Sequence, residues 1–440
     1  MTSLPRDLPG LDPAWSRFVE VVDGSTGGTA QQHLLDTGPA LEALGVRPVG
    51  TILAVHGNPT WSYLWRRVVA ESLDRAAQGA PAWRVIAVDQ LEMGWSARTG
   101  VVRRLEDRVR DLGSLTDALG LAGPVVALGH DWGGVIASGW ALAHPDLLHG
   151  LVLTNTGVDL GVGVPAALRA ALAASSTGTE RTTAFLDTTL GIAHPALTRD
   201  VRGAYRSPYR SAERRRGIRD FVADIPSATD HPSRAAIDAI ADGLTALEVP
   251  ALLLWGPRDP VFQERYLHDL MGRMPHASVH RFEGAGHLVP EDADVAGAVL
   301  DWVEAPTAAR SDPAPAGPAT AAYRPLWAEL DARRDDAATA LVELGAKPRT
   351  IAWRLLSRRV LEVAAGLTAA GVRPGDRVSL LVPPGADLTA VLYACLRIGA
   401  VVVVADAGLG LRGLTRAVRG AWPDHVIGAT PGLVAARLGL

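Results

Sequence analysis

Short apolar runs alternate with helical patterns over residues 17–303. Six runs are β-branched or leucine-rich and are bounded by turn residues, as strands covered on both faces are. They are Thr51–Val55, Val85–Val88, Val125–Leu128, Leu151–Thr154, Ala251–Leu254 and Ser278–Phe282. Two runs ahead of them, Phe18–Val22 and Gln31–Leu35, predict a hairpin. The alternation predicts an α/β fold with a doubly wound, mostly parallel sheet.

One connection in this pattern is far too long for a simple crossover. About ninety residues that read as helices and loops separate the strand ending near Thr156 from the one starting at Ala251. They predict a helical cap, 158–248, over the carboxyl edge of a core built from 1–157 and 249–303. Such a cap suits chemistry in an apolar, water-poor pocket. Its arginines Arg214–Arg216 are interpreted as a solvated or partner-facing surface.

The rest of the chain predicts a linker and a second, smaller α/β unit. Residues 304–322 are rich in Pro and Ala without periodicity, which is typical of a linker. Within 323–440 the pattern predicts two helices and two strands, at Ser357–Ala370, Val378–Val382, Leu388–Leu396 and Ala400–Val404. The single cysteine, Cys395, lies in an apolar helical pattern. It therefore predicts a packed thiol and excludes an intramolecular disulfide or a thiolate metal cluster.

Composition narrows the classes of function. The net charge of −4 over 440 residues gives no footprint for nucleic acid or anionic lipid. No apolar run follows basic residues at the N-terminus, and no run of about 18 apolar residues exists that could span a membrane. We therefore expect a cytoplasmic protein. The histidines do not occur in metal-ligand spacing, so neither a metal nor an organic cofactor is expected.

The strand that ends at Leu128 leads into a glycine-rich turn with a carboxylate at its centre. This turn reads GHDWGG at 129–134, and its central residue is Asp131. Glycines on both sides permit the strained strand-to-helix turn that exposes a nucleophile. A carboxylate attacks carbon directly, without a base to deprotonate it. The competing interpretation is that Asp131 only caps the following helix.

Two further strand ends carry residues that complete a hydrolytic triad. After Ala251–Leu254 comes Asp259, and after the last strand comes His287. The order nucleophile, acid, histidine is the one that this fold imposes. After Thr51–Val55 the turn HGNPTW at 56–61 offers backbone amides and the Asn58 side chain as donors to an anion.

The two motifs HGNPTWSYLWR, 56–66, and GHDWGG, 129–134, resemble the haloalkane dehalogenases among the α/β-hydrolases, over about residues 15–303. The resemblance implies that Asp131 forms a covalent ester and that His287 activates the water that cleaves it. It also implies that Asp259 is the acid partner of the histidine. Asn58 and Trp132 would then hold the leaving anion.

The tail resembles the start of an AMP-forming acyl-CoA synthetase-like enzyme, on the residues LTAAGVRPGDRVSLLVPPGADLTAVLYACLRIGAVVVVADAGLG at 367–410. An unrelated α/β appendage is the alternative. A dehalogenase-like hydrolase ahead of a synthetase is similar to the fusions of bacterial long-chain olefin biosynthesis. DQLEMGWSAR at 89–98 also resembles their decarboxylase branch. The resemblance implies conversion of a hydrophobic cis-3-alkyl-4-alkyloxetan-2-one to a cis-alkene and CO₂. It also implies a thiolase, a reductase and a β-lactone synthetase as partners.

Two other functions stay open at this point. A haloalkane dehalogenase or epoxide-type hydrolase would use the same triad, and a non-catalytic scaffold would organise pathway enzymes through the tail. No Ser/Thr/Gly-rich phosphate loop followed by lysine occurs before Leu440, and Lys347 lies outside any such loop. We therefore expect no ATP activation by the second unit, which would be a fragment of a longer fusion or a remnant. It should also expose apolar surface at a sheet edge.

Overall fold

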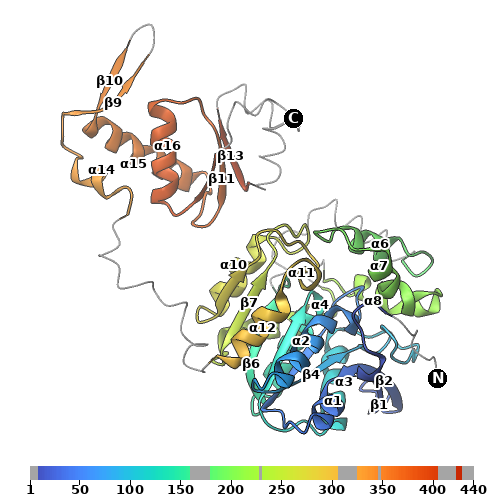
Figure 1. The fold of residues 1–440 in the computed structure, drawn as a ribbon. Helices are drawn as coiled ribbons and strands as arrows, with labels where there is room; N and C mark the ends of the chain where they lie inside the picture. Colours follow the sequence, from blue (N-terminus) through green and yellow to red (C-terminus); the bar gives the residue numbers. More distant parts are fainter. Residues whose placement is uncertain are drawn as a thin grey trace. The chain divides into compact units, whose positions relative to one another are not determined.

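The computed structural model describes residues 8–158, 179–226, 230–305, 325–344, 348–404 and 423–428. The chain divides into two compact units, Met1–Ala316 and Gly317–Leu440, which are drawn in Figure 1. Residues 159–178 of the predicted cap and most of the predicted linker, 304–322, lie outside the described residues. Within the described ranges, no helix is long and apolar enough to cross a membrane.

An eight-stranded sheet forms the centre of the first unit, in the order β1-β2-β4-β3-β5-β6-β7-β8. Its strands are β1 (Ser16–Val22), β2 (Thr29–Asp36), β3 (Gly50–Val55), β4 (Trp83–Val88), β5 (Val125–His130), β6 (Leu148–Thr154), β7 (Ala251–Trp255) and β8 (Ser278–Arg281). β2 runs antiparallel to β1 and to β4, and all other neighbours are parallel. The predicted hairpin and doubly wound sheet are confirmed. The loops after β3, β5, β6 and β7 therefore meet at one edge of the sheet.

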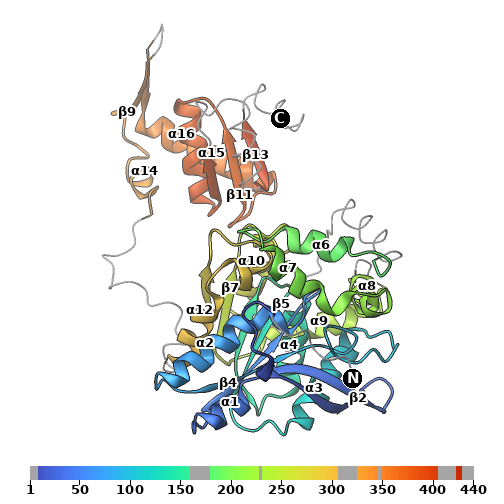
Figure 2. The ribbon, with the colours of Figure 1, turned by 45° about the vertical axis from the view of Figure 1, so that its right-hand side comes forward.

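Helices cover both faces of this sheet (Figures 1 and 2). On one face α2 (Arg66–Ala77) packs against α12 (Val295–Glu304). On the other face α3 (Leu105–Ala118), α4 (Trp132–Ala143) and α9 (Arg234–Thr245) pack together. The peripheral helices are α1 (Gly38–Ala43), α10 (Glu264–Arg273) and α11 (Val289–Asp292). Every residue of β3 and β5 is buried, which explains why these strands read as continuous apolar runs.

The helices that follow β6 separate into two groups. Three of them, α6 (Ala184–Gly191), α7 (Arg199–Arg206) and α8 (Arg216–Ala223), gather apart from the sheet, as Figure 2 shows. The fourth, α9, falls within the range predicted as cap, 158–248, but packs beside α4. A Cβ on Gly243 of α9 would lie 2.5 Å from the Leu142 side chain. This close approach places α9 in the helical layer of the core.

The interpretation of Arg214–Arg216 as a solvated surface is wrong for the first two arginines. Arg215 is buried and donates to the backbone carbonyls of Tyr209, at 2.7 Å, and of Glu180, at 2.9 Å. Arg214 donates to the carbonyl of Pro208 at 2.9 Å. The long guanidinium side chains bridge irregular backbone that has no partner within a helix, so they hold the cap together.

The second unit contains a three-stranded parallel sheet in the order β12-β11-β13 and a β9–β10 hairpin. Its elements are α14 (Ala328–Ala332), β9 (Thr339–Glu343), β10 (Arg349–Ala352), α15 (Trp353–Ala369), β11 (Arg377–Leu381), α16 (Ala386–Arg397), β12 (Val401–Val404) and β13 (His425–Gly428). Cys395 is a buried free thiol, as predicted. Val401 and Val404 on the outer strand β12 are exposed, which confirms the predicted apolar edge among the described residues.

Candidate active site

Asp131 occupies a strained turn between β5 and α4. Its backbone has φ 54°, in the region that favours glycine, and the neighbouring glycines allow this turn because other backbone passes very close. A Cβ on Gly129 would lie 2.4 Å from the carbonyl oxygen of Gly133, and one on Gly133 would lie 2.1 Å from that of Val55. The strain is therefore built in by close packing, as the elbow motif predicted.

The Asp131 carboxylate is buried and faces backbone N–H groups. Its Oδ1 accepts a hydrogen bond of 2.8 Å from the backbone N–H of Asn58. A Cβ on Gly57 would lie 2.3 Å from this carboxylate, so only glycine fits there. Burial raises the pKa of Asp131 above its ordinary value, against the opposing effects of the His287 charge and of the N–H groups of Trp132 and Asn58. This carboxylate lies at the turn where the elbow motif predicts a nucleophile.

His287 lies between two carboxylates. Its Nδ1 bonds to Oδ2 of Asp259 at 2.9 Å, and its Nε2 lies 3.9 Å from Oδ2 of Asp131. Burial lowers the pKa of His287, but the charge and hydrogen bond of Asp259 and the charge of Asp131 outweigh it and raise the pKa to about 9. Burial likewise raises the pKa of Asp259, but its bonded histidine brings that pKa below the ordinary value. The structure thus brings together the three residues predicted as a triad.

Two residues that the sequence did not single out position this triad. Asn155, directly after β6, donates from Nδ2 to Oδ2 of Asp259 and to the carbonyl of Gly256, each at 2.9 Å. It also accepts from the N–H of Gly256 at 2.7 Å. His130 donates from Nε2 to the carbonyl of His287 at 2.7 Å. The position of Asn155 at a strand's carboxyl end was the available signal, but an asparagine there also reads as a turn residue.

The two predicted anion donors lie beside Asp131 under the cap helix α8. The side-chain amide of Asn58 donates to the carbonyl of Ile218 at 3.2 Å, and its Oδ1 has no partner among the described residues. The Trp132 ring lies 5.6 Å from the Phe221 ring, centroid to centroid. One N–H of Asn58 is therefore bound to the cap, which leaves its second N–H for an anion.

The segment DQLEMGWSAR contributes a rigid loop next to the site. Asp89 directly follows β4 and accepts from the backbone N–H of Ser62 at 2.7 Å and of Trp95 at 2.6 Å. It also bonds to Nδ1 of His33 at 2.7 Å. Burial raises the pKa of Asp89, but the charge and hydrogen bond of His33 lead the effects that bring it to about 2. This carboxylate ties the loop after β4 to the loop after β3.

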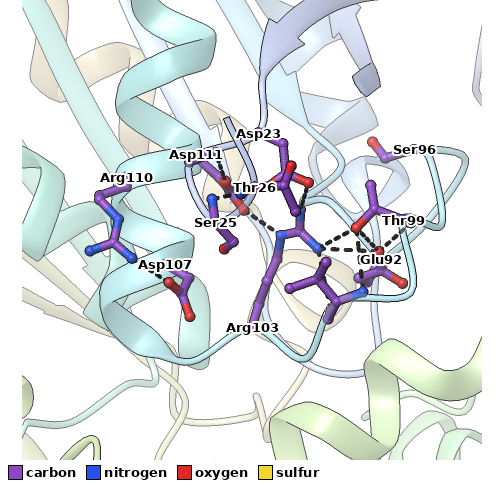
Figure 3. A network of polar contacts seen from close by, with 12 residues as sticks. Asp23, Ser25, Thr26, Glu92, Ser96, Thr99, Arg103, Asp107, Arg110 and Asp111 are labelled. Atoms are coloured by element: carbon purple, nitrogen blue, oxygen red, sulfur yellow. Dashed lines mark hydrogen bonds and ion pairs between the residues drawn. The ribbon is translucent and has the colours of Figure 1, made fainter. Parts of the chain in front are cut away.

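A second buried network stabilises the same side of the core (Figure 3). Arg103 is completely buried and binds three carboxylates, with nitrogen–oxygen distances of 2.7 Å to Asp23, 2.6 Å to Asp111 and 3.2 Å to Glu92. Sequence reasoning missed this network, because the three acids come from the β1–β2 turn, from α3 and from the loop after β4. Such an arrangement fixes these loops relative to one another.

Two adjacent acids on α11 tie the histidine loop to the cap. Glu291 pairs with Arg66 and accepts from the Tyr205 hydroxyl at 2.6 Å. Asp292 accepts from the N–H groups of Gly286 and of His194, each at 2.8 Å. Tyr205 and His194 come from the insertion after β6, and Gly286 directly precedes His287. The histidine loop and the cap thus share one short helix. No cluster of possible metal ligands occurs among the described residues.

Residues 50–294 match the alpha/beta hydrolase fold family. The chain therefore belongs to that family and is an enzyme of the α/β-hydrolase superfamily. Residues 327–437 match the family of AMP-binding enzymes, so an AMP-binding domain follows as the second domain.

Among curated proteins the chain is similar to two proteins named cis-3-alkyl-4-alkyloxetan-2-one decarboxylase. The one from Shewanella oneidensis is 31% identical over 253 residues, which cover 55% of this chain and 77% of that protein. The one from Xanthomonas campestris pv. campestris is 32% identical over 256 residues, covering 55% and 83%. Haloalkane dehalogenase 2 of Mycobacterium bovis is 30% identical over 264 residues, covering 57% and 86%.

Solved haloalkane dehalogenases share the fold. DpaA from Paraglaciecola agarilytica has a TM-score of 0.57 at 23% identity, with 67% of this chain and 94% of that chain covered. DbeA from Bradyrhizobium elkani has a TM-score of 0.55 at 24% identity, with 66% and 97% covered. The predicted fold and the predicted resemblance to dehalogenases are confirmed.

Proposed function

We propose that the hydrolase unit is a β-lactone decarboxylase, which converts a cis-3-alkyl-4-alkyloxetan-2-one to a cis-alkene and CO₂ in olefin biosynthesis. The observation that carries the proposal is a buried carboxylate, Asp131, at the elbow, with His287 and Asp259 behind it. The similarity to two proteins named as decarboxylases supports this substrate. The resemblance to olefin-pathway fusions extends this proposal to a β-lactone synthetase, a thiolase and a reductase as partners.

The first step of one route opens the ring at the carbon that bears the ring oxygen. A carboxylate oxygen of Asp131 attacks this carbon, the ring carbon–oxygen bond breaks, and its electron pair forms a free carboxylate on the substrate. In this route the second N–H of Asn58 and the indole N–H of Trp132 donate to that carboxylate. Strain in the four-membered ring drives the step, and no proton is transferred.

The second step releases both products. The neighbouring carbon carries the new carboxylate, and the bond between the two breaks to release CO₂. Its electrons form the double bond to the attacked carbon, and the bond from that carbon to the Asp131 oxygen breaks to regenerate the aspartate. Attack inverts the carbon, and anti elimination then gives the same alkene as a syn loss from the lactone, which is the cis isomer. Attack at the carbonyl to form a mixed anhydride is the alternative first step. In either route the His287 imidazolium stabilises the Asp131 carboxylate when it is released.

The test is an assay of the purified chain with a cis-3,4-dialkyl β-lactone, with alkene and CO₂ measured together. We expect both in equal amounts, and none with Asp131→Ala. Asp146→Ala, an exposed aspartate just beyond α4, is the matched control and should retain full activity. A ring-opened hydroxy acid as the only product would refute decarboxylation.

A haloalkane dehalogenase or epoxide-type hydrolase is the second candidate, because the chain is 30% identical to haloalkane dehalogenase 2. The same site would then need water to cleave the Asp131 ester, with His287 as the base. Turnover in H₂¹⁸O separates the two functions. Hydrolysis incorporates the label into Asp131 and the product alcohol over repeated turnovers. Decarboxylation leaves Asp131 without label and forms no alcohol.

A further inference from the structure

The side chain of Arg108, in the first half of α3, is buried without a hydrogen-bond partner in the described part of the chain. It is 2% exposed, and none of its three side-chain nitrogens has a partner among the described residues. Arg103, five residues earlier, shows the usual solution, with a carboxylate on each side (Figure 3). A buried guanidinium without acceptors costs several kcal/mol. A role for this guanidinium at the site would explain why the fold tolerates that cost.

Arg108 is connected to Trp132, one of the two anion donors, through the ring of Phe221. Its guanidinium carbon lies 3.4 Å from the centroid of the Phe221 ring, a close cation–π contact. The Phe221 ring in turn packs against the ring of Trp132 at 5.6 Å. Arg108 and Trp132 thus both contact one buried aromatic ring of α8. A fixed Phe221 limits the orientations that the Trp132 indole can adopt.

A small cavity lies beside Arg108. Its volume is about 10 Å³, and Arg108, Gln32 and Gln90 are among the residues that line it. The amide oxygens of both glutamines are buried, and no described residue donates to them. A single water held in this cavity would accept from the guanidinium and donate to the amide oxygens.

Gln90 connects the cavity beside Arg108 to the loop that bears Asn58, through hydrogen bonds to His56. Its Nε2 donates to the carbonyl of His56 at 2.7 Å, and its backbone N–H donates to Nε2 of His56 at 3.3 Å. His56 stands two residues before Asn58 in the same tight turn. A shift of Gln90 would therefore move this turn.

Charges around Arg108 keep it cationic. Burial lowers its pKa to about 10, with the carboxylates of Asp224 and Asp220 opposing the decrease and the charge of Arg103 adding to it. Asp111 also opposes the decrease. The guanidinium is therefore charged at neutral pH, and the cation–π contact is maintained.

We propose that Arg108 is a positioning residue of the leaving-group site, which orients the Trp132 indole through Phe221 and the Asn58 turn through a cavity water and Gln90. The proposal rests on the proposed function, in which these donors hold the carboxylate that leaves the β-lactone. It adds to that function a buried cation, Arg108, that fixes the orientation of the two anion donors.

The test measures anion binding and turnover separately in the full chain. Bromide affinity is read from quenching of tryptophan fluorescence, with Trp132→Phe used to isolate the signal of the site. Arg108→Met keeps the length of the side chain but removes the charge and the donors. We expect it to weaken bromide binding about tenfold and to lower kcat on the β-lactone by a similar factor, with KM nearly unchanged, because the donors act on the charge that develops during ring opening.

Two further variants make the result decisive. Arg84→Met removes a paired arginine at the amino end of β4, where it binds Asp36 at 2.7 Å, so it should reduce stability without changing bromide affinity. Arg108→Lys keeps a charge and one donor group, and we expect an intermediate affinity.

A folded Arg108→Met chain with unchanged bromide affinity would overturn the proposal. If Arg108→Met does not fold, an unchanged bromide affinity in Arg108→Lys would likewise overturn the proposal. Bromide binding that depends on Arg108, in a chain that forms no alkene from the lactone, would refute the decarboxylase function and leave the inference about the anion site standing.

Discussion

Removing the Asp259 carboxylate should change how the stability of the hydrolase unit depends on pH. The pKa of His287 is about 9 in the folded protein, against an ordinary value of about 6.5. A raised histidine pKa contributes stability that is fully present below pH 6.5 and is lost as the pH rises through 9. At about 1.4 kcal/mol per pH unit, this contribution is on the order of 3 kcal/mol.

Asp259→Asn deletes the carboxylate that does most to raise this pKa, while burial continues to lower it. The pKa of His287 in the variant should fall well below its wild-type value, since only the weaker effects of Asp131 and Asp292 then support the imidazolium. We therefore expect the wild-type chain to lose about 3 kcal/mol of unfolding free energy between pH 6.5 and pH 9, and the variant to lose less than half of that.

Pulse proteolysis across a urea titration at the two pH values measures this loss for the hydrolase unit itself, which matters because the chain has two units. Other groups that titrate between pH 6.5 and 9 contribute equally to both chains and cancel in the comparison. Equal pH-dependent losses in the wild-type and Asp259→Asn chains would refute the assignment of His287 as a buried imidazolium held by Asp259.

Three other substitutions test the packing around the site. Gly57→Ala places a Cβ 2.3 Å from the Asp131 carboxylate, so turnover should fall by about 100-fold or more in a chain whose circular dichroism is unchanged; activity within threefold of wild type would contradict this geometry. Arg103→Met leaves three buried carboxylates without their cation and should cost about 3–5 kcal/mol in urea unfolding, and a loss below 1 kcal/mol would mean that they are hydrated. Asn155→Ala removes a donor to Asp259 and should reduce kcat about tenfold with little change in KM; a change in KM alone would assign Asn155 to substrate binding.

Much of the first unit could be predicted because the candidate site residues follow the carboxyl ends of strands. Apolar runs located β3, β5 and β7, and the residues just beyond them are the ones that the sheet brings together. Asp131 was recognisable because glycines flank it, and only glycine tolerates the close backbone found there. Order along the chain was then enough to pair it with Asp259 and His287.

The parts that could not be predicted depend on contacts between distant segments. Arg103 and Arg215 read as ordinary charged residues in the sequence, yet both are buried by partners that no spacing rule connects. The place of α9 beside α4 was missed for a similar reason, because a helix after a long insertion has the same amphipathic pattern in a cap as in a core. Arg108 gave no signal at all, since its partners are a ring and a cavity.

The short helix α11 makes the alignment of the histidine and the position of the cap mechanically dependent. Its two acids bind the cap through Tyr205 and His194 and bind the histidine loop through Gly286. A displacement of the cap would pull on Asp292, which binds both His194 of the cap and Gly286 directly before His287. The position of the cap and the orientation of His287 are therefore mechanically coupled through α11, and a substitution that loosens the cap should also misalign the histidine.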